Sequence, residues 1–279
     1  MRGNKYFAVL ATVAVTACGG GDGDDNDRVE LLTGEFIDSA VIGISYSTES
    51  QSGTTNSAGE FQYVSGESVV FSIGELTLPS ISAAPVVTPV DMSDSGEFDD
   101  DTVVNISKLL QSLDEDADLQ NGIQIPESAS ASASELDYSV GRSEFESNPN
   151  VINFIANSGS VSTSLRSTDD VLAHLDETLL IPITQLDLTE LVGTRLFLNE
   201  NFLILRNDGT FDGTWEDQPL LATWELRDGY FCRVLTEFHN ADAIGAEDCQ
   251  LWRKEITGNR IRGSRDRGNG VSWWYTIGS

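Results

Sequence analysis

Two tight turns constrain the last third of this chain to antiparallel β-structure. Asn207-Asp208-Gly209 separates the runs FLIL and TFDGTW, and Arg227-Asp228-Gly229 separates LATWEL from YFCRVLTEF. Asp-Gly between two apolar runs is a strong hairpin signal, because both residues tolerate the positive φ that a tight turn needs. Further strands are expected at 249–254, 259–264 and 271–277. About seven or eight short antiparallel strands predict a meander or a small barrel over residues 191–279.

Two cysteines, Cys232 and Cys249, fall in this predicted β-domain. In an oxidising compartment we expect them to form a disulfide, and closing a loop of about 15 residues stabilises a fold by about 3 kcal/mol in the chain-entropy account. The alternative is two free buried thiols, which is less usual in a secreted protein. Their spacing excludes a Cys-x-x-Cys redox motif. The stretches GTW, DGYFCR and DCQLW are similar to small periplasmic β-domains of unknown role, and the strand plan resembles calycin-like barrels.

The first residues of the chain predict a secretory signal that ends at a cysteine. Arg2 and Lys5 precede an apolar stretch, residues 6–15, that is too short for a bilayer span of about 20 residues. The letters VTAC follow and resemble the bacterial lipobox. The resemblance implies removal of residues 1–17 and attachment of diacylglycerol and a fatty acid such as palmitate to Cys18. The alternative is an ordinary signal peptide with a chance cysteine, but the whole chain has only three cysteines.

The residues after the lipobox extend this prediction. Residues 18–30 are rich in glycine and aspartate and would form a flexible acidic tether. Gly19, rather than aspartate, follows the cysteine, and in the lipobox family this implies sorting to the outer membrane. We therefore expect an outer-membrane lipoprotein that faces the periplasm or the cell surface, with lipid as its only membrane anchor.

The charge of the chain is strongly acidic and unevenly distributed. Removing residues 1–17 from 279 leaves 262 residues, which suits two domains because one core serves about 100–200 residues. The whole chain has 45 acids against 16 bases, which argues against nucleic acid as a partner. Residues 18–192 hold 32 acids and four bases, whereas residues 193–279 hold 13 acids, ten bases and all five tryptophans. The shift predicts two domains, over 31–190 and 191–279.

The first domain begins with strands and turns. Ile42, Ile44 and Tyr46 alternate with small or polar residues, which is the period of a half-buried strand. In TTNSAGEFQYVSGESVVFSIG, two turns flank the aromatic pair Phe61 and Tyr63, and an apolar strand follows. Residues 33–78 thereby resemble the prealbumin-like, or carboxypeptidase-regulatory-like, β-sandwich of secreted bacterial proteins. The resemblance implies an accessory module without catalytic residues.

Helical segments are expected after this sandwich. Val103, Ile106, Leu110 and Leu113 recur at helical spacing, and the acids at 99–101 suit a helix N-terminus. Two further helices are expected at 151–156 and 171–180, and Ser167 with Asp170 forms a capping box for the second.

The low-complexity run ESASASASE, residues 127–135, predicts an exposed loop. The fold class expected is therefore mainly β with an α-helical insertion. An N-terminal β-sandwich with short helices precedes a C-terminal antiparallel β-meander or small calycin-like barrel.

The run LDEDADLQNGI is a candidate calcium loop. Oxygen ligands at alternating positions are what calcium loops supply, and here they would be Asp114, Asp116, Asp118 and Asn121. The run departs from an EF-hand, since Leu119 stands where that motif has glycine and Ile125 where it has glutamate. The alternative is a solvated acidic turn.

Residues 253–268 are a candidate anion site. They contain six of the ten bases of the second domain, with Trp252, Trp273 and Trp274 nearby. Guanidinium groups and tryptophan faces suit a sugar or lipid phosphate. The alternative, which we favour, is that these arginines pair with acids of the same protein. The candidate ligands are Arg260, Arg262, Arg265 and Arg267.

The sequence points to no reaction. His174 and His239 are the only histidines, and the chain has no G-x-S-x-G, H-E-x-x-H or phosphate-binding glycine loop. We therefore predict a protein that is not an enzyme but a lipid-anchored envelope protein with a structural or interaction role, whose partners would be the membrane and envelope proteins or glycans. One alternative is small-ligand binding by the C-terminal β-domain, and another is a cryptic hydrolase.

Overall fold

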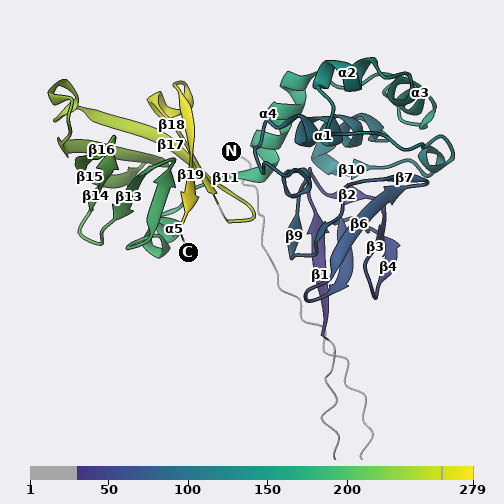
Figure 1. Cartoon of the computed structure of the whole chain (residues 1–279), viewed down its shortest axis with the longest axis horizontal. Coiled ribbons are helices and arrows are strands. Elements are labelled where there is room, and N and C mark those ends of the chain that lie inside the picture. Colours follow the sequence, from purple (N-terminus) through teal and green to yellow (C-terminus); the bar gives the residue numbers. More distant parts are fainter. Residues whose placement is uncertain (1–29, 259, 279) are drawn as a thin grey trace, which may run out of the picture. The chain divides into compact units, whose positions relative to one another are not determined.

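The last third of the chain forms a closed barrel of eight antiparallel strands (Figure 1). The computed structural model describes residues 30–258 and 260–278. Each barrel strand pairs with its neighbour in sequence, and the first pairs with the last to close the ring. The strands are β12 (Arg195–Leu198), β13 (Asn201–Leu205), β14 (Thr210–Trp215), β15 (Gln218–Arg227), β16 (Tyr230–Glu237), β17 (Glu247–Glu255), β18 (Arg260–Ser264) and β19 (Ser272–Ile277). Of the two predicted forms, meander or barrel, the closed barrel is the one observed.

Tight turns connect the strands as the hairpin signals predicted. Asp228 and Gly229 have φ values of 53° and 80° and join β15 to β16. Gly209, with φ of 77°, closes the turn between β13 and β14. Both hairpin predictions are therefore confirmed, with Gly209 in one turn and Asp228 and Gly229 in the other adopting the left-handed backbone that suits the twist of the strands.

The barrel interior is filled by apolar side chains. Phe231 stacks on Trp252 with ring centroids 3.9 Å apart, and it also stacks with Trp224 at 5.7 Å. Trp252 is fully buried, and its indole N–H donates to Gln250 at 2.8 Å. The helix α5 (Gln185–Glu190) contributes buried Leu188 to the same core. Eight-stranded barrels are just wide enough for side chains to fill them, and this one follows that rule.

The first part of the chain forms small sheets that enclose an aromatic core. One sheet has the order β5-β1-β9, and a second has the order β4-β3-β6-β7 with β8 also paired to β6. Phe36 and Phe71 stack at 4.3 Å, and Phe61 meets Phe71 edge-on at 5.3 Å. The strands are β1 (Leu31–Phe36), β2 (Val41–Ile42), β3 (Ser45–Ser47), β4 (Ser52–Thr54), β5 (Glu60–Val64), β6 (Ser68–Ile73), β7 (Leu76–Thr77), β8 (Ile81–Ser82), β9 (Val86–Val87) and β10 (Ile123–Gln124). The aromatic pair of β5, Phe61 and Tyr63, is buried.

The predicted alternation at 42, 44 and 46 is wrong at its first position. Ile44 and Tyr46 are buried, but Val41 rather than Ile42 is the buried residue of β2. Gly43 lies between them with φ of 79° and ends β2. This left-handed residue breaks the strand, so the period of two does not continue across it.

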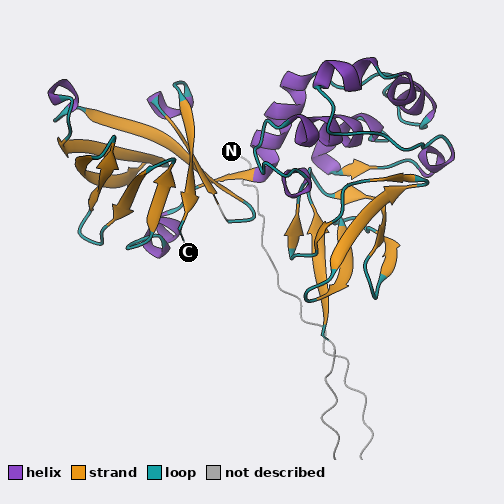
Figure 2. Cartoon of the chain, viewed as in Figure 1, coloured by secondary structure: helices purple, strands orange, loops and turns teal. Residues whose placement is uncertain are grey.

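The helices lie on one side of the N-terminal strands (Figure 2). The α-helices of this part are α1 (Asp101–Leu113), α2 (Arg142–Ser147), α3 (Pro149–Asn157) and α4 (Thr168–Leu179). Short 3₁₀ turns occur at η1 (Pro89–Met92), η2 (Leu119–Asn121), η3 (Glu127–Ala131), η4 (Ala241–Ala243) and η5 (Asp266–Gly268). The three predicted helices are confirmed as α1, α3 and α4. The low-complexity run is mostly exposed as predicted, but its first five residues form η3, in which Ala129 is fully buried.

Side-chain caps begin α1 and α4. Asp100 accepts a hydrogen bond from the Thr102 amide, and Ser167 accepts one from Asp170. The predicted capping box of α4 is incomplete. The Asp170 carboxylate accepts from the Ser167 hydroxyl at 2.7 Å and not from the Ser167 backbone amide. The caps satisfy amides that the first turn of a helix leaves unpaired.

Helix α1 is buried on every side from Val103 to Leu113. Its apolar face was predicted, but its polar residues Asn105, Lys108 and Gln111 are each no more than 1% exposed. Asn105 donates to the carbonyls of Tyr138 and Val140 at 3.0 and 2.8 Å. A helix that is enclosed in this way must find a partner for each polar side chain, and this need determines the contacts around it.

Candidate functional site

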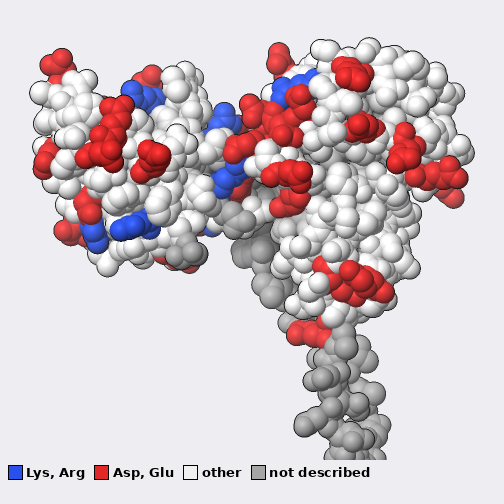
Figure 3. Space-filling view, in the orientation of Figure 1, with Lys and Arg blue, Asp and Glu red and all other residues white. Residues whose placement is uncertain are grey.

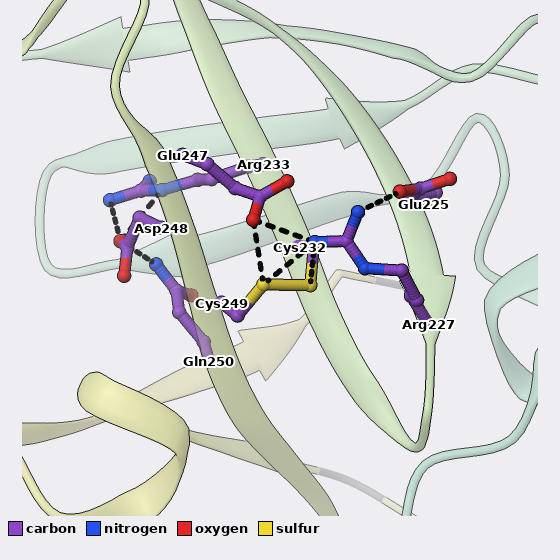
Figure 4. The surroundings of a disulfide bond; sticks show 8 residues. All are labelled: Glu225, Arg227, Cys232, Arg233, Glu247, Asp248, Cys249 and Gln250. Atoms are coloured by element: carbon purple, nitrogen blue, oxygen red, sulfur yellow. Dashed lines mark hydrogen bonds and ion pairs between the residues drawn. A yellow bond between two sulfur atoms is a disulfide. The ribbon is translucent and has the colours of Figure 1, made fainter.

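A disulfide joins two adjacent barrel strands (Figure 4). Cys232 of β16 and Cys249 of β17 lie directly opposite each other, with an S–S distance of 2.09 Å and Cα atoms 4.0 Å apart. Cys232 is buried, and Cys249 is half-buried. The predicted pairing is the one observed, and the register of the hairpin brings the two cysteines together.

Charged side chains surround this disulfide on the outside of the barrel. Arg227 pairs with Glu247 at 2.6 Å and Glu225 at 3.0 Å, and its guanidinium lies 3.5 Å from the sulfur of Cys249 (Figure 4). The hydrogen bond from Arg227 lowers the pKa of the Glu247 carboxyl. The arrangement is a cross-link between strands covered by an exposed ion pair, which suits a structural disulfide.

The four arginines of the predicted anion site do not converge on one point. Arg260 pairs with Glu255 at 2.7 Å and with Glu97 at 3.3 Å, and Arg262 pairs with Asp176. Arg265 lies 3.8 Å from Asp248, and the guanidinium of Arg267 lies 5.1 Å from the Tyr230 ring centre. Arg260 and Arg262 both approach the face of Trp274. This is the intramolecular pairing that the alternative interpretation of the sequence expected.

Most carboxylates of the acidic loop accept hydrogen bonds from within the loop itself. Asp116 accepts hydrogen bonds from the Asp118 amide at 2.9 Å and from the Asn121 side chain at 3.0 Å. Asp118 accepts from the Gln120 amide at 3.2 Å, and Asp114 accepts from Gln124 at 2.9 Å. Burial raises the pKa of the fully buried Asp114, whereas the Asp118 amide lowers that of Asp116.

Calcium binding at this loop stays a prediction. Within residues 30–258 and 260–278, no three His, Cys, Asp or Glu side chains gather in a metal-holding arrangement. One oxygen of Asp114, Oδ2, is buried without a hydrogen-bond partner in this part of the chain. The loop therefore presents one unpaired oxygen and several that serve its turns.

A buried polar cluster, which we define as Asp38, Ser39, Gln111 and His174, joins the sandwich to α1 and α4. Gln111 donates to the Asp38 carboxylate at 2.9 Å. The Nε2 atom of His174 lies 3.0 Å from the Asp38 carbonyl and 3.2 Å from the Ser39 hydroxyl. Sequence patterns gave no sign of Asp38, because a lone acid in a turn resembles any surface residue until the turn is covered.

This cluster does not have the geometry of a catalytic triad. The Ser39 hydroxyl donates to the Leu119 carbonyl at 2.8 Å, so its proton is already engaged. Asp38 approaches the same ring nitrogen of His174 as Ser39 does, with its carboxylate 3.9 Å away. A triad needs the acid at the opposite nitrogen, where it orients the base. The other histidine, His239, lies 3.9 Å from Glu216 at the surface.

Burial dominates the ionisation of this cluster. Desolvation raises the pKa of the Asp38 carboxyl from 3.8 to about 8, although Gln111, Ser107 and Arg166 oppose the shift. Desolvation also lowers the pKa of His174. Both groups are therefore neutral near pH 7, which is the form that a buried site favours.

The barrel surface carries a pocket of about 700 Å³ lined by β14, β15, β16 and the turn between β13 and β14. Its charged lining is self-paired, since Arg206 bonds Asp212 at 2.5 Å, while Asp208 accepts from the Thr210 hydroxyl at 2.6 Å. The pocket therefore offers a ligand few free polar groups, and the barrel core behind it is packed with aromatic side chains.

Comparisons with known proteins add no assignment. No protein family, curated protein or solved structure matches this chain. Among the helices of the described residues, none has the length and apolar character to span a bilayer. The predicted lipidation site, Cys18, lies outside the described residues.

The first prediction concerns pH. A raised carboxyl pKa means that the folded state binds a proton which the unfolded state releases, so stability falls as pH rises between 3.8 and about 8. We expect the Asp38 carboxyl to decrease the free energy of unfolding by about 1.5 kcal/mol from pH 6.5 to 8, because the unfolded carboxyl is ionised throughout this window. Asp38→Asn should abolish this slope in urea titrations, and the exposed control Asp137→Asn should retain it. An Asp38→Asn protein with the wild-type slope would contradict the assignment.

The second prediction concerns calcium. If the loop binds calcium only when folded, stability rises by about 2.7 kcal/mol at a hundredfold excess over Kd, and magnesium has less effect. Melting midpoints should be compared in calcium, magnesium and sodium chloride of matched ionic strength. Asp116→Asn keeps the turn acceptor and should remove the calcium shift, while Asp137→Asn should keep it. Equal shifts in all three salts would identify a solvated acidic turn.

Proposed function

We propose that this protein is a lipid-anchored protein of the cell envelope with a structural or interaction role. The observation that carries the proposal is the disulfide between Cys232 and Cys249. Disulfides persist in oxidising compartments outside the cytoplasm, so the pair supports export. The signal-like start and the lipobox resemblance ending at Cys18 point in the same direction.

The geometry of the described residues favours this role over the two alternatives. The barrel core is filled by Trp252, Phe231 and their neighbours, which leaves little support for a ligand held inside the barrel. Ser39 and His174 lack the arrangement that activates a nucleophile, so a hydrolase gains no support from them. The acidic surface disfavours nucleic acid and suits envelope proteins or glycans as partners (Figure 3).

Under this proposal the lipid on Cys18 holds the protein at the outer membrane, and residues 18–30 act as the tether. The cross-linked barrel then serves as a stable extracytoplasmic module. Calcium at Asp114, Asp116 and Asp118 would be an accessory to this role and is not required by it.

Cell fractionation tests the proposal. We expect the wild-type protein to partition into the detergent phase with an oxidised disulfide, because it is both exported and acylated. Cys18→Ser should lose detergent partitioning, since it has no sulfur to acylate. The matched control, Cys232→Ser with Cys249→Ser, should keep it. Free thiols at both positions in protein from intact cells, or unchanged partitioning of Cys18→Ser, would refute the proposal.

A further inference from the structure

A pocket among the helices concentrates the rare bases of the first part of the chain. Residues 31–190 contain 27 acids and only three bases, Lys108, Arg142 and Arg166. Two of these three, Lys108 and Arg166, line a single cavity of about 300 Å³. The cavity lies where α1, α2 and α3 meet the residues that precede α4. On the face drawn in Figure 3, the surface of this part is largely acidic or uncharged.

Lys108 is a fixed part of this pocket. It is 1% exposed, and its ammonium pairs with the carboxylate of Glu146, which is 42% exposed. A buried ammonium is costly unless it is paired, so Glu146 balances its charge. The pair is neutral as a unit and leaves the charge of the pocket to Arg166.

Arg166 has a charge without a carboxylate partner in the described part of the chain. No acid among residues 30–258 and 260–278 lies within salt-bridge distance of its guanidinium, and its Nε atom is buried without a hydrogen bond. Its backbone is held in place, because its amide donates to the Ser112 hydroxyl at 2.9 Å. The pocket therefore has one net positive charge on a positioned donor group.

The remaining lining selects the kind of anion. Ile152, Ile155 and Leu165 supply an aliphatic wall. Thr163, Ser164 and Ser167 supply hydroxyl groups. A guanidinium forms two parallel hydrogen bonds with a carboxylate. One net charge balances a monoanion, whereas a phosphate dianion would also face the carboxylate of Glu146. A volume of about 300 Å³ is at the lower limit of small-molecule pockets and fits a short chain.

We propose that this pocket binds a short-chain organic carboxylate, with Arg166 as its charge partner and the aliphatic wall against its alkyl chain. The site is independent of the lipid anchor, the disulfide and the acidic loop.

The test uses the mature chain with Cys18→Ser and follows binding by calorimetry and by NMR shifts of the pocket residues. The probe is butyrate, with butylammonium and inorganic phosphate as matched comparisons. We expect saturable butyrate binding, with weaker binding of phosphate and none of butylammonium. Arg166→Gln should weaken butyrate binding about tenfold or more, because it removes a charged hydrogen-bond donor. Arg142→Gln removes the one base of this part that lies outside the pocket and should leave binding unchanged.

A second variant guards against a folding defect in Arg166→Gln. Ile152 is 50% exposed, so Ile152→Glu should fold normally and still weaken butyrate binding by placing a negative charge at the pocket wall. The proposal is overturned if butyrate does not bind saturably, if phosphate binds more tightly, if butylammonium binds equally well, or if Arg166→Gln or Ile152→Glu binds butyrate as the wild type does.

Discussion

The burial of α1 is the constraint on which the first part of the structure depends. A helix enclosed on all sides cannot direct its polar side chains to water, so each must meet a partner or carry a desolvation cost. The side-chain nitrogen of Asn105 meets that need through two backbone carbonyls, that of Gln111 through Asp38, and that of Lys108 through Glu146. These contacts reach segments far apart in the sequence, and they connect the sandwich with α2 and the loop before it. The amide oxygens of Asn105 and Gln111 have no hydrogen-bond partner among the described residues and carry that cost.

The same constraint explains the two unusual sites in this region. Asp38 lies in a turn that α1 and α4 cover, and burial raises the pKa of its carboxyl. Lys108 of α1 pairs with Glu146 of α2, which balances its charge, and the neighbouring Arg166 has no carboxylate partner in the described part of the chain. The polar cluster and the cationic pocket are therefore two consequences of placing one polar helix inside the protein. The barrel solves its own packing differently, by turns that close the ring and an aromatic core that fills it.

The sequence was most informative where the physical signal is local. Asp-Gly turns predicted the barrel hairpins, helical spacing predicted α1 and α4, and two cysteines in a domain expected to be secreted predicted the disulfide. The register break at Gly43 was missed, because the sequence does not show which glycines adopt a positive φ. The short helix α2 was missed as well. Asp38, Lys108 and Arg166 became visible only in three dimensions, since whether a charged residue is buried depends on elements distant in sequence.

Native-state hydrogen exchange tests the central claim that α1 and the sandwich form one cooperative unit through these buried contacts. The amides of α1 and of the central strand β6 should then exchange only through global unfolding, with equal opening free energies that fall together in urea. The exposed ends of α2 and α3 should exchange faster. If the amides of α1 instead open by a separate, lower-energy step while β6 stays protected, the helix is only attached to the sandwich and the account is contradicted.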